Sequence, residues 1–83
     1  MLIEPFRIDF LLIPKFSMMA LVSAIEPLRV ANRVLAWDCY SWRFISQNGE
    51  PVSASNGMVQ ICHKISEITD KPNAIFVNAS YDP

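Results

Sequence analysis

The side chains of this sequence that could act as nucleophiles or metal ligands are two cysteines and a single histidine. Cys62 is followed directly by His63, whereas Cys39 lies far from both in the chain. Adjacent side chains on a strand point to opposite faces, so Cys62 and His63 are poorly placed for a thiolate–imidazole pair. A metal site needs three or four ligands, usually closely spaced. We therefore predict no catalytic residue, no metal site and no cofactor.

A polar cluster lies within a segment of helical periodicity. Glu26, Arg29 and Arg33 follow one another at intervals of one helical turn, which places them close together on a helix surface. Asn32 occupies a gap in the apolar stripe of the same segment, an unusual position for an amide. The cluster is either a solvated face with a weak ion pair or a contact with a subunit or ligand. We expect a structural or interface role rather than ligand binding.

One carboxylate interrupts the first apolar segment of the chain. Asp9 lies among the hydrophobic residues of the sequence FRIDFLLI. Such a residue either faces a pocket as a functional group or serves the structure, on the polar side of a strand or as a cap. We expect the structural role.

A strand and a helix must position the first group of candidate residues. Phe6 to Ile13 begins with alternation and ends in an apolar run, which indicates a strand buried in a parallel sheet. Pro14 ends it, and Ser17 is a predicted helix N-cap. The helix is expected from Met18 to about Ala36, with a bend near Ser23 caused by Pro27. Its predicted apolar face consists of Met18, Leu21, Val22, Ile25, Leu28 and Leu35.

The remaining pattern predicts a second strand at Ser41 to Gln47, a turn at residues 48–51, and a hairpin of residues 52–55 and 58–61. Asn56-Gly57 is its expected two-residue turn. A short helix or turn at 63–69 and a strand at Ala74 to Asn78 complete the chain. A strand, a helix and another strand in this order predict an α/β fold with a right-handed crossover.

Two loops follow strands that should be parallel, so they should share one edge of the sheet. Ligands of open α/β sheets bind beyond the carboxyl ends of strands and near helix N-termini. The predicted ligand-binding residues in these loops are Lys15, Phe16, Ser17, Asn78 and Ser80. A cationic amine would also favour aromatic faces, which Phe16, Trp37, Trp42 and Tyr81 could supply, although each is more often a core or dimer contact.

Composition limits the classes of function. Hydrophobic residues make up 52% of the 83 residues and charged residues 18%, the reverse of a disordered chain. So small a domain cannot easily bury that much apolar surface, which suggests a missing partner, either more of the same domain or a second subunit. The net charge of -1 and the absence of a basic patch argue against direct DNA binding.

The sequence also bears on cellular location. The apolar run at Phe10 to Ile13 is too short to span a bilayer, and the first residues lack the features of a signal peptide. Cys39 and Cys62 are not closely paired. We expect two reduced thiols in a cytoplasmic protein with no membrane contact.

Three segments in order resemble the sensing domain of AraC-family transcription regulators. They are FLLIPKFSMMALVSAIEPLRVANRVL (residues 10–35), YSWRFISQNGEPVSASNG (residues 40–57) and AIFVNASYDP (residues 74–83). The resemblance covers almost the whole chain. It implies a flavodoxin-like, class I glutamine amidotransferase-like (DJ-1/PfpI-like) three-layer fold with a mainly parallel sheet. Within this family, the sequence is most similar to regulators that control the catabolism of quaternary amines such as glycine betaine and carnitine.

The resemblance implies that residues 1–83 are the N-terminal half of an effector-sensing domain. The helix-turn-helix domain that would bind DNA is absent from this chain, and a small-molecule effector and a homodimer are expected. Enzymatic relatives place a carboxylate on the first helix, where this chain has Leu21, and often have glycines where Ala79 and Ser80 stand. These departures favour a regulator. The alternatives are a DJ-1/PfpI-type cysteine hydrolase or amidotransferase-like enzyme, and a dimerisation fragment that binds no ligand.

Overall fold

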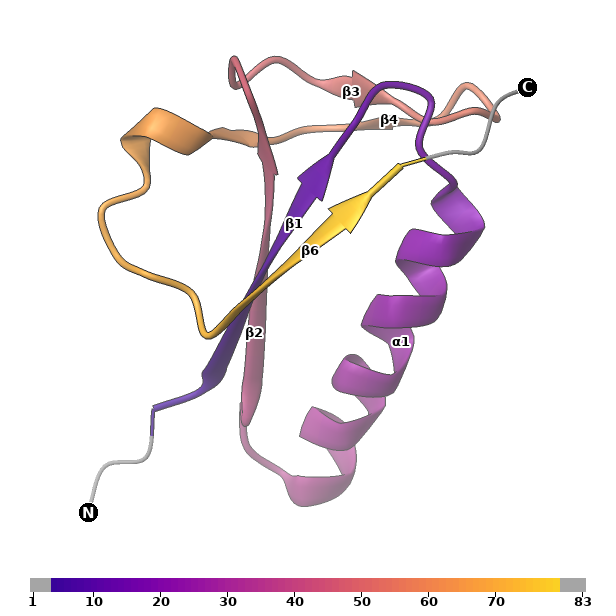
Figure 1. Ribbon diagram of the computed structural model, residues 1–83. Coiled ribbons are helices and arrows are strands. Elements are labelled where there is room, and N and C mark those ends of the chain that lie inside the picture. Colours follow the sequence, from indigo (N-terminus) through magenta and orange to yellow (C-terminus); the bar gives the residue numbers. More distant parts are fainter. Residues whose placement is uncertain (1–3, 80–83) are drawn as a thin grey trace.

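The computed structural model describes residues 4–79 and has an α/β architecture with one long helix and a mainly parallel sheet (Figure 1). Its elements in chain order are β1 (Phe6–Leu12), α1 (Met18–Leu35), β2 (Tyr40–Ser46), β3 (Val52–Ser53), β4 (Val59–Gln60), β5 (His63–Lys64), the 3-10 helix η1 (Ile65–Glu67) and β6 (Ala74–Asn78). The predicted fold class is confirmed.

The main sheet has the strand order β5-β2-β1-β6, and all three of its pairings are parallel. β1 lies in the centre, where Phe10 is in register with Phe44 of β2 and with Phe76 of β6. A central strand has neighbours on both edges, which explains the apolar run that marks β1 in the sequence. The strands predicted at both ends of the chain therefore share one sheet and one direction.

Of the three connections between parallel strands, the one from β1 to β2 and the one from β5 to β6 run over opposite faces of the sheet. α1 leads from β1 to β2, whereas the connection from β5 to β6 travels back past both strands. Crossovers of one hand that run in opposite directions must use opposite faces. Figure 1 shows α1 on one side of the strands and the segment after β5 on the other. We call residues 65–73 of this second connection the strap.

The core lies between the sheet and α1. Ile8, Phe10 and Leu12 alternate along β1 and are buried, because alternate side chains of a strand share one face. Leu21 of α1 packs among them and is 1% exposed. The helix face is narrower than predicted: Met18, Ala24, Ile25 and Leu28 pack against the core.

The prediction that Val22 and Leu35 lie on the core-facing side of α1 is wrong, because 45% of the Val22 surface and 56% of the Leu35 surface are exposed. Val22 follows Leu21 directly, so it points about 100° further around the helix and reaches the edge of the contact. Leu35 is the last residue of α1.

α1 begins and ends as capping chemistry requires. The Ser17 hydroxyl accepts a hydrogen bond from the Ala20 amide at 3.2 Å, which confirms the predicted N-cap. Ala36 closes the helix in a left-handed conformation, with φ of 60°. The helix is continuous through Pro27. Within residues 4–79, no helix is long and apolar enough to cross a membrane.

The hairpin and the segment after it differ from the sequence prediction. The Ala54 amide donates to the Met58 carbonyl at 2.7 Å, which leaves three residues, 55–57, in the connection rather than two. Gly57 has φ of 90°, as expected where a three-residue hairpin loop ends in a left-handed residue. A short helix or turn was expected at residues 63–69, but the helix η1 covers only Ile65–Glu67. His63 and Lys64 instead form an additional edge strand, β5.

Candidate functional site

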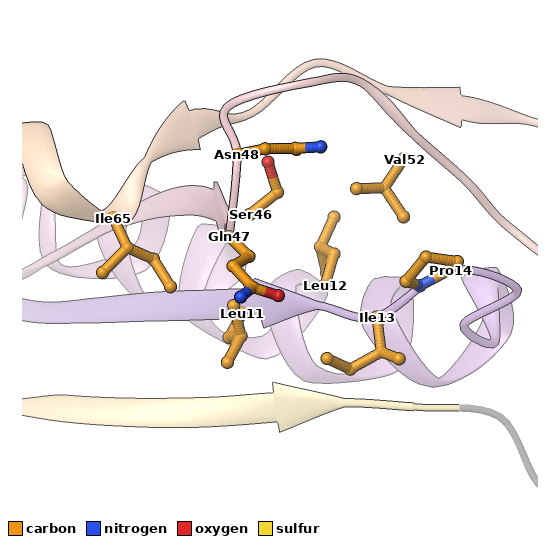
Figure 2. Close-up of a pocket in the computed structure, with 9 residues that line it drawn as sticks. All are labelled: Leu11, Leu12, Ile13, Pro14, Ser46, Gln47, Asn48, Val52 and Ile65. Carbon is orange, nitrogen blue, oxygen red and sulfur yellow. The ribbon is translucent and has the colours of Figure 1, made fainter.

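A cavity of about 400 Å³ opens at the carboxyl edge of the parallel sheet, where β1 and β2 end (Figure 2). We call it the edge pocket. It is lined by Leu11, Leu12, Ile13, Pro14, Ser46, Gln47, Asn48, Val52 and Ile65. An open parallel sheet binds ligands at this edge, so the edge pocket occupies the position that the fold favours for a ligand.

Local hydrogen bonds fix the loop that forms one wall of the edge pocket. The buried Ser46 hydroxyl donates to the Glu50 carbonyl at 3.0 Å, and the Asn48 side-chain oxygen accepts from the Glu50 amide at 3.0 Å. An asparagine that binds the backbone two residues on forms a turn of its own. The loop after β2 is therefore held in one conformation by its own side chains.

The lining of the edge pocket is mainly apolar, with a few uncharged polar side chains. Its polar side chains are Ser46, Gln47 and Asn48, none of which carries a charge, and the other lining residues are apolar. Ligand pockets typically combine an apolar lining with a few polar groups that orient the ligand. Among these lining residues there is no cysteine, histidine or carboxylate that could act as a nucleophile or base.

The structure brings the two predicted ligand loops to one edge of the sheet. The Ile13 amide donates to the Asn78 carbonyl at 3.0 Å, so the chain leaving β1 lies beside the end of β6. Lys15 is exposed in a left-handed conformation, with φ of 67°, and its amide donates to the Ser53 carbonyl at 2.8 Å. Ligand contacts of Lys15, Ser17 and Asn78 stay predictions, and Ser80 lies outside the described residues.

The predicted aromatic residues lie in different environments. Phe16 is 0% exposed and forms a parallel bridge with Ala54, so its ring is part of the core rather than open to a ligand. Trp42 packs against the same core, and 42% of the Trp37 surface is exposed. Tyr81 lies outside the described residues. Of these aromatic residues, none of the three that the structure describes lines the edge pocket.

The polar cluster predicted on α1 separates into parts with different environments. Arg29 and Glu26 form an exposed ion pair, in which Nε of Arg29 donates to a Glu26 carboxylate oxygen at 2.9 Å. The hydrogen bond from Arg29 lowers the pKa of Glu26. Arg33 forms no side-chain ion pair within the described part of the chain. An interface role for this surface stays a prediction.

Asn32 has a structural role, in line with the role expected for the cluster, through partners that the sequence did not identify. Its amide nitrogen donates to the Tyr40 carbonyl and its oxygen accepts from the Tyr40 amide, both at 2.9 Å. The same oxygen accepts from the Cys39 thiol at 3.2 Å. The side chain thus joins the last turns of α1 to the first residue of β2. This contact explains why an amide interrupts the apolar stripe.

The sequence also did not identify an ionic network on the strap side of the sheet. Asp9 is 1% exposed, and its carboxylate accepts from Nε and Nη2 of Arg43 at 2.8 and 3.0 Å. Nη1 of Arg43 donates to Asp70 of the strap at 2.8 Å, and Arg7 pairs with the other oxygen of that carboxylate. The structural role expected for Asp9 is therefore a buried ion pair rather than a solvated position or a cap.

The two cysteines are free thiols, as expected. Burial raises the pKa of the Cys62 thiol. A thiol whose pKa is raised is less reactive at neutral pH than an ordinary cysteine, because the thiolate is the nucleophile. Among residues 4–79, no group of three or more histidine, cysteine, aspartate or glutamate side chains is arranged to hold a metal ion.

The fold and the edge pocket define a class of protein, α/β domains with a mainly parallel sheet and a ligand-sized cavity at its carboxyl edge. The chain is similar to a solved structure, the crystal structure of an AraC family transcriptional regulator from Pseudomonas putida. The TM-score is 0.83 at 26% sequence identity, over 93% of this chain and 48% of that chain.

Curated relatives of this chain are helix-turn-helix (HTH) transcriptional regulators. The HTH-type transcriptional regulator CdhR of Pseudomonas aeruginosa is 50% identical over 74 residues, which cover 89% of this chain and 22% of CdhR. GbdR of the same species is 43% identical over 55 residues, 66% of this chain and 15% of GbdR. GlxA of Rhizobium meliloti is 32% identical over 77 residues, 93% of this chain and 24% of GlxA.

This chain therefore spans about a quarter or less of the length of these relatives. No family model matches the sequence.

Proposed function

We propose that residues 1–83 are part of the effector-sensing domain of a bacterial, cytoplasmic AraC-family transcription regulator. In this proposal, binding of a small molecule controls DNA binding by a helix-turn-helix domain elsewhere in the same protein. The observation that carries the proposal is the edge pocket, a small cavity at the ligand-binding edge of a fold shared with an AraC family regulator. The HTH-type relatives supply the link to transcription.

The charge of the chain supports the placement of DNA binding in a part of the regulator other than the sensing domain. With a net charge of -1, the chain lacks the concentrated positive charge that phosphate contacts require. DNA binding is therefore assigned to another part of the regulator. A homodimer is part of the proposal, because the DNA sites of dimeric helix-turn-helix proteins have two related halves.

In this proposal, an uncharged part of the effector molecule occupies the edge pocket. The pocket lining holds no acidic and no aromatic side chain, so it offers a cation neither a counter-charge nor an aromatic face. A quaternary amine, which the sequence resemblance suggests, would need both from residues outside this lining. Lys15 and Asn78, at the same edge, are the proposed polar contacts for the rest of the effector.

An enzymatic role has less support from the same residues. Leu21, at the position where enzymatic relatives place a carboxylate, is buried in the apolar core. Cys62 is a poor nucleophile, because burial raises the pKa of its thiol. These observations favour a sensing domain over a cysteine hydrolase.

The test is an operator-binding titration of the complete regulator with a panel of small molecules. The panel contains glycine betaine, carnitine and choline, together with neutral molecules of similar size. We expect at least one compound to change the affinity for operator DNA and to raise the unfolding temperature of the protein, since a ligand stabilises the state that it binds. Hydrolysis of an ester or amide panel by the protein, with no effect on DNA binding, would support the enzyme instead.

A further inference from the structure

Asp70 of the strap is held by two arginines in the way that arginines hold a carboxylate ligand. Nη1 of Arg43 donates to one oxygen of the Asp70 carboxylate at 2.8 Å, and Nη1 of Arg7 pairs with the other. Each oxygen thus has its own guanidinium. Charge-assisted contacts of this kind are a common means of carboxylate recognition in proteins.

The Arg43 side chain is anchored to the sheet by a contact that does not involve Asp70. Arg43 uses two other nitrogens to bind the buried Asp9 carboxylate at 2.8 and 3.0 Å, which fixes its guanidinium while Nη1 points to the strap. Arg7 belongs to β1. Asp70, by contrast, lies between η1 and β6 in a segment without regular structure, and half of its side-chain surface is exposed. The Arg43 guanidinium is therefore preorganised by Asp9, and its Nη2 also donates to the Asp70 carbonyl at 3.4 Å. The Arg7 guanidinium has the Asp70 carboxylate as its partner, and this half-exposed carboxylate is the more easily displaced group.

A cavity of about 320 Å³ lies beside this contact, between the strap and the sheet. Its polar lining residues are Asp9, Thr69, Asp70 and Lys71, and the others are apolar: Ile45, Ile65, Ile68, Pro72 and Ile75. Its volume is at the lower end of the range for small-molecule sites. It could hold the apolar body of a small ligand whose charged group lies at the arginines.

We propose that Arg7 and Arg43 form a binding site for a small monocarboxylate with an apolar body, and that Asp70 occupies this site as an internal competitor. Without the Asp70 carboxylate, Nη1 of Arg43 and Nη1 of Arg7 both lose their acceptor, and a bound monoanion replaces the charge that is lost. A bound carboxylate displaces Asp70 and releases the middle of the strap. The site lies on the sheet face opposite α1, apart from the effector position proposed at the sheet edge.

The structure also links the strap to the edge pocket. Ile65, where the strap begins, lines both the edge pocket and the cavity beneath the strap. The far end of the strap is fixed separately, because the Asn73 amide donates to the Arg7 carbonyl at 2.8 Å and the Asn73 side chain accepts from the Arg7 amide at 2.7 Å. Displacement of Asp70 would therefore move the part of the strap before its fixed end at Asn73, and the edge pocket would change through Ile65 at the start of the strap.

The test is calorimetric titration of the full chain with isovalerate, a branched monocarboxylate. Its neutral analogue isovaleramide and inorganic phosphate, which has no apolar body, are the matched ligands. Asp70→Asn removes the competing charge, so isovalerate should bind about tenfold more tightly, as expected if the free site is populated about 10% of the time. Glu67→Gln, elsewhere on the strap, is the control and should bind isovalerate like the wild type.

Arg7→Gln added to Asp70→Asn should abolish the gain. The proposal is overturned if Asp70→Asn binds isovalerate no more tightly than the wild type, or if isovaleramide binds equally well. A second measurement does not depend on the folding of any variant. In the wild type, saturating isovalerate should accelerate amide hydrogen exchange in residues 68–71 and leave β1 unchanged; unchanged exchange in the strap contradicts the proposal. Neither result depends on whether the edge pocket binds an effector.

Discussion

Asp9 of β1 and Arg43 of β2 occupy paired positions in the parallel register of the two central strands, and they form a two-point ion pair on the strap side of the sheet. The Asp9 side chain is 2% exposed and that of Arg43 22%. Two charges thus lie within a largely apolar sheet, each compensated by the other. The same Arg43 guanidinium connects the sheet to Asp70 of the strap.

Asp9→Asn should destabilise the fold strongly. Removing the Asp9 charge takes away the buried partner of Arg43 and leaves only the half-exposed Asp70, and the expected loss is about 3 kcal/mol in the free energy of unfolding, the lower end for a broken buried ion pair. Urea denaturation followed by circular dichroism measures this loss. The matched control is Glu26→Gln, which removes a carboxylate from an exposed ion pair and should leave the stability essentially unchanged. Equal losses in the free energy of unfolding for the two substitutions would show that the Asp9–Arg43 pair stabilises the fold no more than an exposed ion pair does.

Asn32→Ala should weaken the junction between α1 and β2. The substitution leaves the amide and carbonyl of Tyr40 without their side-chain partners, and the expected cost is about 2 kcal/mol. Thermal unfolding of this variant is compared with that of Arg33→Ala, a neighbouring change on the same helix. A lower unfolding temperature for Asn32→Ala alone is expected, whereas a larger effect of Arg33→Ala would contradict the structural role of Asn32.

Gly49→Ala and Gly57→Ala separate two causes of instability. Both glycines have positive φ, 77° and 90°, so an alanine at either position should cost about 1 kcal/mol in backbone strain. At Gly49 the added Cβ would also lie 2.9 Å from the Cβ of Lys64, whereas at Gly57 it would meet open space. We therefore expect Gly49→Ala to be the more destabilising by about 1 kcal/mol or more, as typical of overpacking. Equal unfolding midpoints for the two variants would mean that Lys64 of β5 shifts to accommodate the new methyl group at position 49.

Cys62 should ionise only above the ordinary pH range of a thiol. Burial raises its pKa in the folded protein, so the folded state retains this proton at a pH where the unfolded state has lost it. The contribution of Cys62 to stability should therefore be complete below the unfolded pKa and be lost as the pH rises from there through the folded pKa. The pH profile of iodoacetamide alkylation in Cys39→Ser measures the folded pKa. A midpoint below that of a model thiol would contradict the structure and revive the enzymatic alternative.

The larger elements could be predicted because their signals are local. The apolar run of β1, the stop at Pro14 and the Ser17 cap are all visible within a few residues of sequence. β5 could not be predicted in this way, because two polar residues, His63 and Lys64, carry no periodicity. It is a strand only through its pairing with the end of β2.

The side-chain contacts were harder to predict, because they depend on register and on backbone groups. Asp9 and Arg43 are each the only charged residue in the middle of an apolar strand, but their pairing depends on the alignment of β1 with β2. The partner of Asn32 is the backbone of Tyr40, which has no signature in sequence. Phe16 was assigned to a ligand loop by its position, although its side chain turns into the core.

The most direct test of the sensing role is to fill the edge pocket in the complete regulator. Ile13 lines this pocket and is 40% exposed, so Ile13→Trp should occupy the cavity with little strain. The control is Val34→Trp, at a position on α1 that is 76% exposed and away from the pocket. The measured quantity is the change in operator affinity on addition of effector. We predict that Ile13→Trp loses this change while Val34→Trp keeps it; an effector response in Ile13→Trp equal to that of the wild type would contradict the assignment of the edge pocket.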